Sequence, residues 1–148
     1  MELAKGKEDA LILDQLSVFS ENKAGMLADI MDHLAEAGIN VKALAIADTS
    51  EFGVLRFIVD APKKALTVLK LGGFVASLTP VIAVKMNHEP GSLARIARAL
   101  ANADVSIEYL YACVANEVDT AFAILRVENN DVAVKLLTEK GYEAFKAL

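Results

Sequence analysis

Two stretches of the sequence, Asn22-Lys-Ala-Gly-Met-Leu-Ala-Asp-Ile-Met-Asp-His-Leu-Ala-Glu-Ala-Gly-Ile-Asn-Val-Lys-Ala-Leu44 and His88-Glu-Pro-Gly-Ser-Leu-Ala-Arg-Ile-Ala-Arg-Ala-Leu-Ala-Asn-Ala-Asp-Val-Ser-Ile-Glu-Tyr-Leu110, are versions of one another. They align without a gap, so that Gly25 matches Gly91 and Leu34 matches Leu100. Self-similarity of this kind marks a repeated structural unit. The sequence therefore predicts two copies of one small domain.

The chain of 148 residues has room for two such units. Units of about 65–70 residues are only marginally stable alone, so we expect them to be fused and packed. The predicted boundaries are an N-terminal extension at 1–13, a first domain at 14–78 and a second domain at 80–148. Thr79-Pro80 is the whole predicted linker, and the residues before Leu11 are predicted to be a loose end.

Each copy shows the same order of strand and helix patterns. The first has strands at 15–20, 39–48, 52–60 and 74–78, a helix after the turn at 21–25, and a helix from Pro62 to Gly72-Gly73, with Asn22 as the expected N-cap. The second has strands at 81–86, 105–115, 119–127 and 142–146 and helices after 87–91 and at 130–140. Gly38, and Asp104 in its place, are expected to end the first helix of each copy in a left-handed conformation. The β-α-β-β-α-β order predicts an α+β fold of two ferredoxin-like units, each an antiparallel sheet with both helices on one face.

Alternation along the strands places many apolar residues on the sheet face away from the helices. A face this apolar usually marks an interface. We expect sheet-to-sheet packing, between the two units or between chains, with a homodimer as the default assembly. The residues predicted on this face are Ser17, Phe19, Ala43, Ala45, Val54, Arg56 and Ile58 in the first copy and Val81, Ala83, Tyr109, Tyr111, Cys113, Phe122 and Ile124 in the second.

Composition excludes several classes of function. The net charge is −5 and no run of Lys or Arg occurs, which argues against a nucleic-acid partner. The single Cys113 rules out an intrachain disulfide and fits a reducing compartment. No apolar run approaches the roughly 20 residues of a membrane span, and the charged N-terminus is unlike a signal peptide. We expect a soluble cytoplasmic protein.

The sequence offers little catalytic chemistry. His33 and His88 lie in different copies, and neither has metal-ligand spacing with Cys113. His33 is expected to be a surface residue, and no nucleophile elbow, phosphate loop or dinucleotide fingerprint occurs. We predict no catalytic residue, no metal and no cofactor, and rank an enzyme last among the alternatives.

The glycine turns at 21–27 and 87–93 are the candidate sites. Each places backbone N–H groups at a helix N-terminus, where the helix dipole favours an anion such as a carboxylate. Gly25 and Gly91 lack a Cβ, which lets a ligand approach closely, or alternatively lets helix and strand pack tightly. The two explanations remain open at this level.

The turn Asn22-x-x-Gly25-x-Leu27, the exit Gly38-Ile-Asn-Val41 and the strand order resemble an ACT domain, and His88-Glu-Pro-Gly-Ser-Leu93 resembles the same signature again. The similarity covers nearly all of residues 14–148, as in tandem ACT proteins that stand alone. It implies a regulatory module that binds an amino acid at the seam where the turn of one unit meets the second strand of a neighbour. The family usually has Asp or Asn where this chain has His88, which implies another ligand, or none, at the second turn.

Carried onto this chain, the resemblance implies two ligand-binding sets. One combines Asn22, Lys23, Ala24, Gly25, Met26 and Leu27 with Tyr109 and Tyr111, and the other combines His88, Gly91, Ser92 and Leu93 with Ile46 and Asp48. The leading prediction is an allosteric sensor of an amino acid. The alternative is a ligand-independent regulatory subunit that docks on a separate metabolic enzyme, since no enzyme domain is attached.

Overall fold

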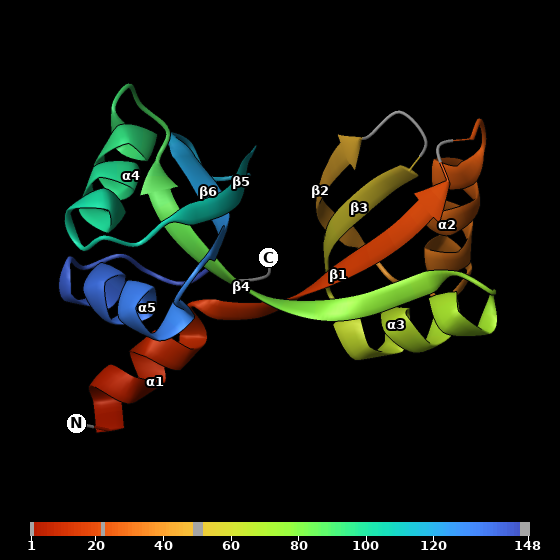
Figure 1. Ribbon diagram of the computed structural model, residues 1–148, viewed down its shortest axis with the longest axis horizontal. Helices are drawn as coiled ribbons and strands as arrows, with labels where there is room; N and C mark the ends of the chain where they lie inside the picture. Colours follow the sequence, from red (N-terminus) through yellow and green to blue (C-terminus); the bar gives the residue numbers. More distant parts are fainter. Residues whose placement is uncertain (1, 22, 49–51, 146–148) are drawn as a thin grey trace. The chain divides into compact units, whose positions relative to one another are not determined.

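The computed structural model describes residues 2–21, 23–48 and 52–145 (Figure 1). The chain has an α+β fold, and its antiparallel strands are hydrogen-bonded in the order β2-β3-β1-β4-β6-β5. The elements are α1 (Glu2–Ala10), β1 (Ile12–Glu21), α2 (Met26–Glu36), β2 (Val41–Asp48), β3 (Phe52–Val59), α3 (Pro62–Leu71), β4 (Val75–Asn87), α4 (Ser92–Asn102), β5 (Ile107–Val114), β6 (Thr120–Val127) and α5 (Asn130–Glu139).

The backbone forms two compact units, each of the predicted ferredoxin-like type. The first unit is Asp14–Thr79, and the second is Pro80–Lys146 together with Met1–Leu13. The domain boundaries at 14–78 and 80–148 remain a proposal, and the two units are described separately below.

The first unit packs α2 and α3 side by side on the strands β2-β3-β1-β4. Leu16 lies opposite Phe57 in the register of β1 and β3, and both side chains are fully buried. Ile30 and Leu34, four residues apart on one face of α2, enter the same core. The apolar face of α2 and the inward-facing residues of β1 and β3 therefore form one apolar layer.

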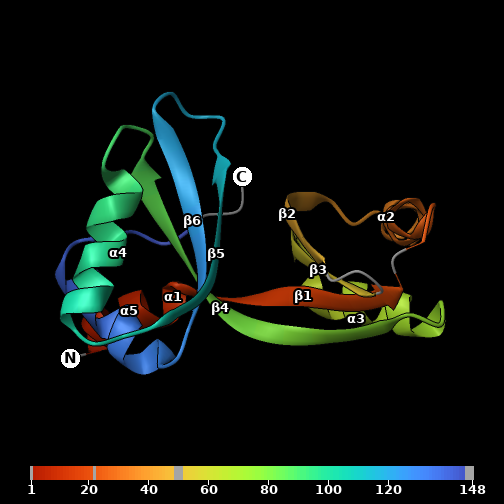
Figure 2. The ribbon, with the colours of Figure 1, turned by 45° about the horizontal axis from the view of Figure 1, so that its top comes forward.

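The second unit repeats this arrangement with α4 and α5 on one side of β4, β6 and β5 (Figure 2). The helix exits are alike: Gly38 has φ 72° and Asp104 has φ 58°. In both units the next residue closes the helix, as Ile39 N–H donates to Leu34 C=O and Val105 N–H to Leu100 C=O, each at 2.9 Å. The predicted left-handed exits are confirmed, with Asp accepting a conformation that glycine adopts more readily.

The predicted linker at Thr79-Pro80 is wrong. Both residues lie inside one strand, β4, which runs without interruption from Val75 to Asn87. Proline has a fixed φ compatible with extended backbone and removes only its own N–H donor. Pro80 stands where the strand passes from one unit to the next, a place where a missing ladder donor is tolerated.

The prediction of a loose N-terminus is also wrong, because Glu2–Ala10 forms α1, which contacts α5 (Figure 1). Leu11 follows it and is 1% exposed, buried with Ile82 and Val84 in the core of the second unit. The Leu11 C=O accepts a hydrogen bond of 2.8 Å from Ala83 N–H. An apolar side chain anchors this segment, which the repeat alignment leaves without a counterpart.

The predicted last strand at 142–146 is reduced to a single bridge between Val84 and Ala144. Lys85 N–H donates to Glu143 C=O at 2.8 Å, and Phe145 N–H donates to Ala83 C=O at 3.3 Å. Leu11 takes the N–H of Ala83, so two segments lie along this edge of β4. The chain after Leu11 continues as β1 beside β4, whereas residues 143–145 form only the single bridge. Lys146 lies outside the described residues.

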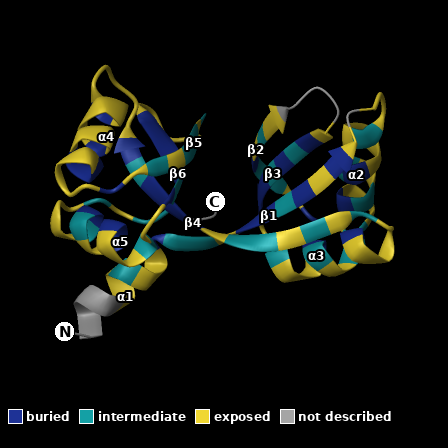
Figure 3. Ribbon diagram, viewed as in Figure 1, coloured by how far each residue is buried: buried dark blue, intermediate teal, exposed yellow. Residues whose placement is uncertain are grey.

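The sheet faces away from the helices differ between the units. In the second unit the centre of this face is covered, since Val81, Ala83 and Ile124 are fully buried. Figure 3 colours the strands of each unit by the burial of their residues. Phe145 contributes to this burial by packing edge-on against Phe122, with ring centroids 4.2 Å apart.

In the first unit the same face exposes Phe19, which is 51% accessible. The predicted sheet-to-sheet packing remains a prediction. Among the residues that the structure describes, no helix has the length and apolar character needed to cross a membrane.

Candidate functional site

The two glycine turns have the same backbone geometry. Gly25 has φ 87° and ψ −10°, Gly91 has φ 91° and ψ −11°, and each is the residue immediately before its helix. The prediction of Asn22 as N-cap of α2 is wrong, because Gly25 holds that position; Asn22 itself lies outside the described residues. A left-handed φ of this size is costly for residues with a Cβ, so backbone conformation explains both glycines.

The tight-packing explanation for these glycines is not supported. A Cβ built on Gly25 meets nothing within 4 Å, and one on Gly91 meets only the guanidinium of Arg95, at 3.1 Å from Nη1. Among the described residues, no strand backbone lies that close to the Cβ position of either glycine. The space above each glycine is therefore open to a ligand or to a flexible side chain.

Backbone and side-chain hydrogen bonds hold the second turn in place. His88 N–H donates to Asp119 C=O at 2.7 Å, which ties the turn to the hairpin between β5 and β6. Arg95 reaches back from the first turn of α4, where its Nη2 donates to Glu89 Oε1 at 3.0 Å and to Ser92 Oγ at 3.1 Å. Ser92 is 5% exposed. A guanidinium, a hydroxyl and a carboxylate thus surround the start of α4.

The first turn carries the opposite arrangement of charge. Lys23 forms an ion pair of 2.6 Å with Glu21, and this pairing raises the pKa of the Lys23 ammonium. The acidic residue in the first turn of α2 is Asp29, whereas the aligned position in α4 is Arg95. Glu89 similarly stands where the first copy has Lys23. An acid near a helix N-terminus already compensates the dipole there, so the second turn is the better anion site.

A surface hollow of about 440 Å³ lies at the second turn and is lined by the continuous run from Met86 to Ala94. It brings together the predicted residues His88, Gly91, Ser92 and Leu93. Sequence reasoning missed the other lining residues and also Arg95. The reversal of charge between Asp29 and Arg95 in the aligned copies is the signal that could have found it.

The remaining predicted residues are spread over the two units. In the first, Lys23, Ala24 and Gly25 are exposed, Met26 is partly buried and Leu27 is 36% exposed. Ile46 lies on the edge strand β2 and is 54% exposed, and Asp48 ends that strand.

In the second unit, Tyr109 and Tyr111 lie half-buried on β5, opposite Arg126 and Ile124 of β6. The first turn and these tyrosines belong to different units, as do the second turn and the pair Ile46 and Asp48. Their meeting in one site therefore remains a prediction.

Other reactive groups have structural roles. Burial raises the pKa of the Cys113 thiol, which lowers its fraction of nucleophilic thiolate. His33 is partly exposed, and its side chain makes specific contacts: its Nδ1 lies 2.7 Å from the Asp29 carbonyl oxygen and its ring packs edge-on against Phe74. Within the described part of the chain, no group of three or more His, Cys, Asp or Glu side chains is placed to hold a metal ion.

Comparison with known proteins shows which proteins this chain is similar to. No curated protein matches it. A crystal structure of a protein from Bacteroides thetaiotaomicron is similar, with 37% identity, a TM-score of 0.84, and coverage of 90% of this chain and 91% of the other.

The regulatory subunit of aspartate kinase from Thermus thermophilus, in its ligand-free form, shares 18% identity and a TM-score of 0.62 over 88% of this chain and 97% of its own. The corresponding subunit from Thermus flavus shares 19% identity and a TM-score of 0.57 over 86% and 95%. At identities this low, the similarity to the two Thermus structures shows only that they share the fold of this chain. The family model described as the ACT domain pair matches residues 11–146, and the chain therefore belongs to the ACT domain pair family.

Proposed function

We propose that this ACT domain pair is a regulatory sensor that binds a small effector, an amino acid, at the second glycine turn. The observation that carries the proposal is the hollow of about 440 Å³ at the start of α4, with Arg95 and Glu89 beside it. Family membership supports a regulatory role rather than catalysis, and two proteins of the same fold are named as regulatory subunits of an enzyme.

The chemistry of the turn suits a zwitterion. The first N–H groups of α4 have no acceptor within their own helix, so a carboxylate placed there gains hydrogen bonds and a favourable dipole. Arg95 adds a guanidinium, which binds carboxylates with two parallel hydrogen bonds. Its present partner Glu89 is 52% exposed, and an ion pair in such a position is weak. An effector can therefore take Arg95 with its carboxylate and Glu89 with its ammonium.

The rest of the site is supplied by a neighbouring unit, as the resemblance to the family implies. We assign Ile46 and Asp48 of a second strand to the second turn, and Tyr109 and Tyr111 of β5 to the first turn. The first turn is the poorer carboxylate site because Asp29 already occupies the start of α2 with negative charge. Binding shifts the arrangement of units to the extent that the effector binds one arrangement more tightly.

The wider proposal rests on family membership and on the likeness in fold to regulatory subunits of an enzyme. The chain is a cytoplasmic non-enzyme that forms a homodimer and controls a separate metabolic enzyme. No nucleic acid or membrane takes part.

The direct test is a thermal-shift screen of all twenty amino acids at millimolar concentration. A ligand at one hundred times its Kd stabilises the folded state by about 2.7 kcal/mol. For a chain of this size that corresponds to a rise in Tm of roughly 5–10 °C. A Tm that stays constant with every amino acid contradicts the proposal.

Two variants of α4 locate the site. Arg95→Gln removes the cation at the turn, and Arg98→Gln removes an exposed cation one helical turn later. Losing a hydrogen bond between charged groups weakens affinity by roughly tenfold or more. We expect that loss for Arg95→Gln alone; equal affinities in the two variants would place the effector elsewhere.

A second candidate is the ligand-independent subunit that docks on a separate enzyme. It is favoured by Phe19 and Phe52, whose rings stack at 5.6 Å on the exposed sheet face of the first unit, 51% and 43% accessible. Exposed aromatic residues are enriched in protein interfaces. Retention of a specific enzyme by the immobilised full chain, without any added small molecule and lost in Phe19→Ser, would favour this candidate.

A further inference from the structure

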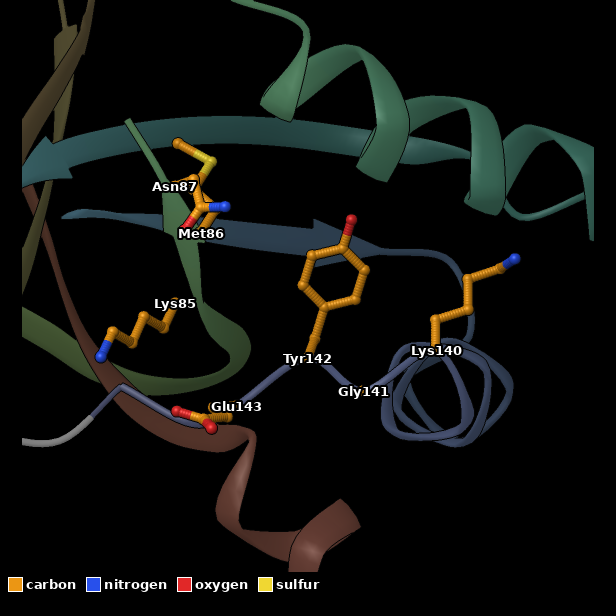
Figure 4. A pocket seen from close by; sticks show the side chains of 7 residues that line it. All are labelled: Lys85, Met86, Asn87, Lys140, Gly141, Tyr142 and Glu143. Carbon is orange, nitrogen blue, oxygen red and sulfur yellow. The ribbon is translucent and has the colours of Figure 1, made fainter. Parts of the chain in front are cut away.

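A second cleft lies in the second unit, at the far end of β4 (Figure 4). We call it the C-terminal cleft. It measures about 370 Å³, which falls within the range of small-molecule pockets. Its lining residues are Lys85, Met86, Asn87, Lys140, Gly141, Tyr142 and Glu143.

The cleft exists because the backbone ladder along this edge of β4 stops early. Within the described residues, the last bond of this ladder joins Lys85 N–H to Glu143 C=O at 2.8 Å. Gly141, with φ 87°, follows the end of α5, and the chain meets β4 only from Glu143 onward. Met86 and Asn87 therefore extend past the ladder, and the Tyr142 side chain stands beside them (Figure 4).

A smaller cavity of about 140 Å³ adjoins the cleft. It shares Met86, Asn87 and Tyr142 with the cleft and is also lined by Ser92 and Arg95 of α4. Tyr142 thus contributes to both spaces, and its half-buried ring is held between them. The combined lining is mostly polar, with Met86 as its main apolar side chain.

Some of the basic side chains of this lining form ion pairs with described residues, and one does not. Lys85 is paired with Glu117 at 3.1 Å, and Arg95 with Glu89 at 3.0 Å. Lys140 takes part in none of the ion pairs found among the described residues. Its ammonium follows the end of α5, where a cation also faces the negative end of the helix dipole.

The described lining contains strong hydrogen-bond donors. Lys140 offers three N–H donors, Tyr142 a hydroxyl and Asn87 an amide, and Glu143 is the one carboxylate among these residues. A ligand with acceptor oxygens suits the ammonium and the hydroxyl. The carboxylate of Glu143 repels a doubly charged anion, which favours a single negative charge over phosphate.

We propose that the C-terminal cleft binds a small polar monocarboxylate, with its carboxylate on Lys140 and Tyr142. The site lies within one unit, and it shares Met86 and Asn87 with the hollow at the second glycine turn. Lys140 and Tyr142 do not line that hollow, so a loss of binding in variants of these two residues distinguishes this proposal from the proposed function.

The test uses the full chain, labelled with ¹⁵N, and three probes: lactate, the neutral isostere lactamide, and inorganic phosphate. Amide shifts recorded during each titration report where and how tightly the probe binds. We expect lactate to move the amides of residues 140–143, which do not line the hollow at the second turn, in a saturable manner, and lactamide to leave them unmoved. Equal binding of lactamide, tighter binding of phosphate, or no saturable shift with lactate overturns the proposal.

Variants tie the binding to named groups. Lys140→Gln removes the unpaired ammonium and Tyr142→Phe removes the hydroxyl, while Lys135→Gln removes an exposed cation of the same helix that lies outside the cleft. Loss of a charged hydrogen bond lowers affinity by roughly tenfold. We expect that loss in Lys140→Gln, a smaller one in Tyr142→Phe, and none in Lys135→Gln. Similar affinities for Lys140→Gln and Lys135→Gln would overturn the assignment even if lactate binds.

Discussion

Gly72→Ala tests the packing of His33 between the two helices of the first unit. Gly72 follows α3 with φ −78° and ψ 0°, a conformation that alanine adopts freely. Its added Cβ would lie 2.8 Å from Cδ2 and 2.9 Å from Nε2 of His33, and 3.3 Å from Cδ2 of Phe74. The imidazole cannot swing away without cost, because Nδ1 contacts the Asp29 carbonyl at 2.7 Å and the ring packs on Phe74.

The magnitude follows from two opposing effects. Overpacking of this kind costs about 1–3 kcal/mol. Replacing glycine by alanine at a compatible φ stabilises by about 0.4–1 kcal/mol through the unfolded chain. We therefore expect Gly72→Ala to lower the free energy of unfolding by roughly 1–2 kcal/mol.

The assay is urea denaturation of a double-mutant cycle with His33→Ala. Removing the ring removes the clash, so Gly72→Ala should be neutral or stabilising in the His33→Ala background, with a coupling energy of about 0.5–3 kcal/mol. Gly73→Ala is the matched control: its φ of 87° strains any side chain in open space, and His33→Ala should not relieve that strain. The reasoning is refuted if Gly72→Ala has the same effect in both backgrounds.

Two further predictions concern the second unit. Leu11→Ala removes a side chain that is 1% exposed and should cost about 2–5 kcal/mol in urea denaturation, whereas Leu13→Ala, at a half-buried position, should cost less. Equal, small losses would show that the N-terminal segment does not belong to the core. Because burial raises the pKa of Cys113, its thiolate fraction at pH 8 is below that of a free thiol, so iodoacetamide should modify it more slowly in the folded chain than after unfolding in urea. Equal rates of modification in the folded and unfolded states would contradict the burial of Cys113.

The glycine turns show how far sequence reasoning reached at the site. The repeat alone identified Gly25 and Gly91, because a left-handed φ is a local requirement that one residue type satisfies best. It missed Arg95, whose importance comes from folding back over Gly91 toward Glu89 and Ser92. Side-chain direction of that kind depends on the path of the turn, which spacing does not reveal.

Asn22 shows the limit at a helix end. The residue type is a strong N-cap, but α2 begins only after Gly25. Propensity favours a cap wherever Asn precedes a helical pattern, whereas the actual start is set by the residue at which the backbone leaves its left-handed turn. The structure therefore places the first free N–H groups of the helix later than the residue types suggested.

The sequence by itself determined the two units, the β-α-β-β-α order that they share, and the left-handed exits at Gly38 and Asp104, because each depends on periodicity or backbone preference within a few residues. Only the tertiary structure decided what occupies the edge of β4. There Leu11 and Phe145 each bond to Ala83, Glu143 bonds to Lys85, and Pro80 lies inside the strand. Those segments are far apart in the chain, and competition between them is settled by burial of Leu11 in a core assembled from the second copy. The C-terminal cleft exists because of that outcome.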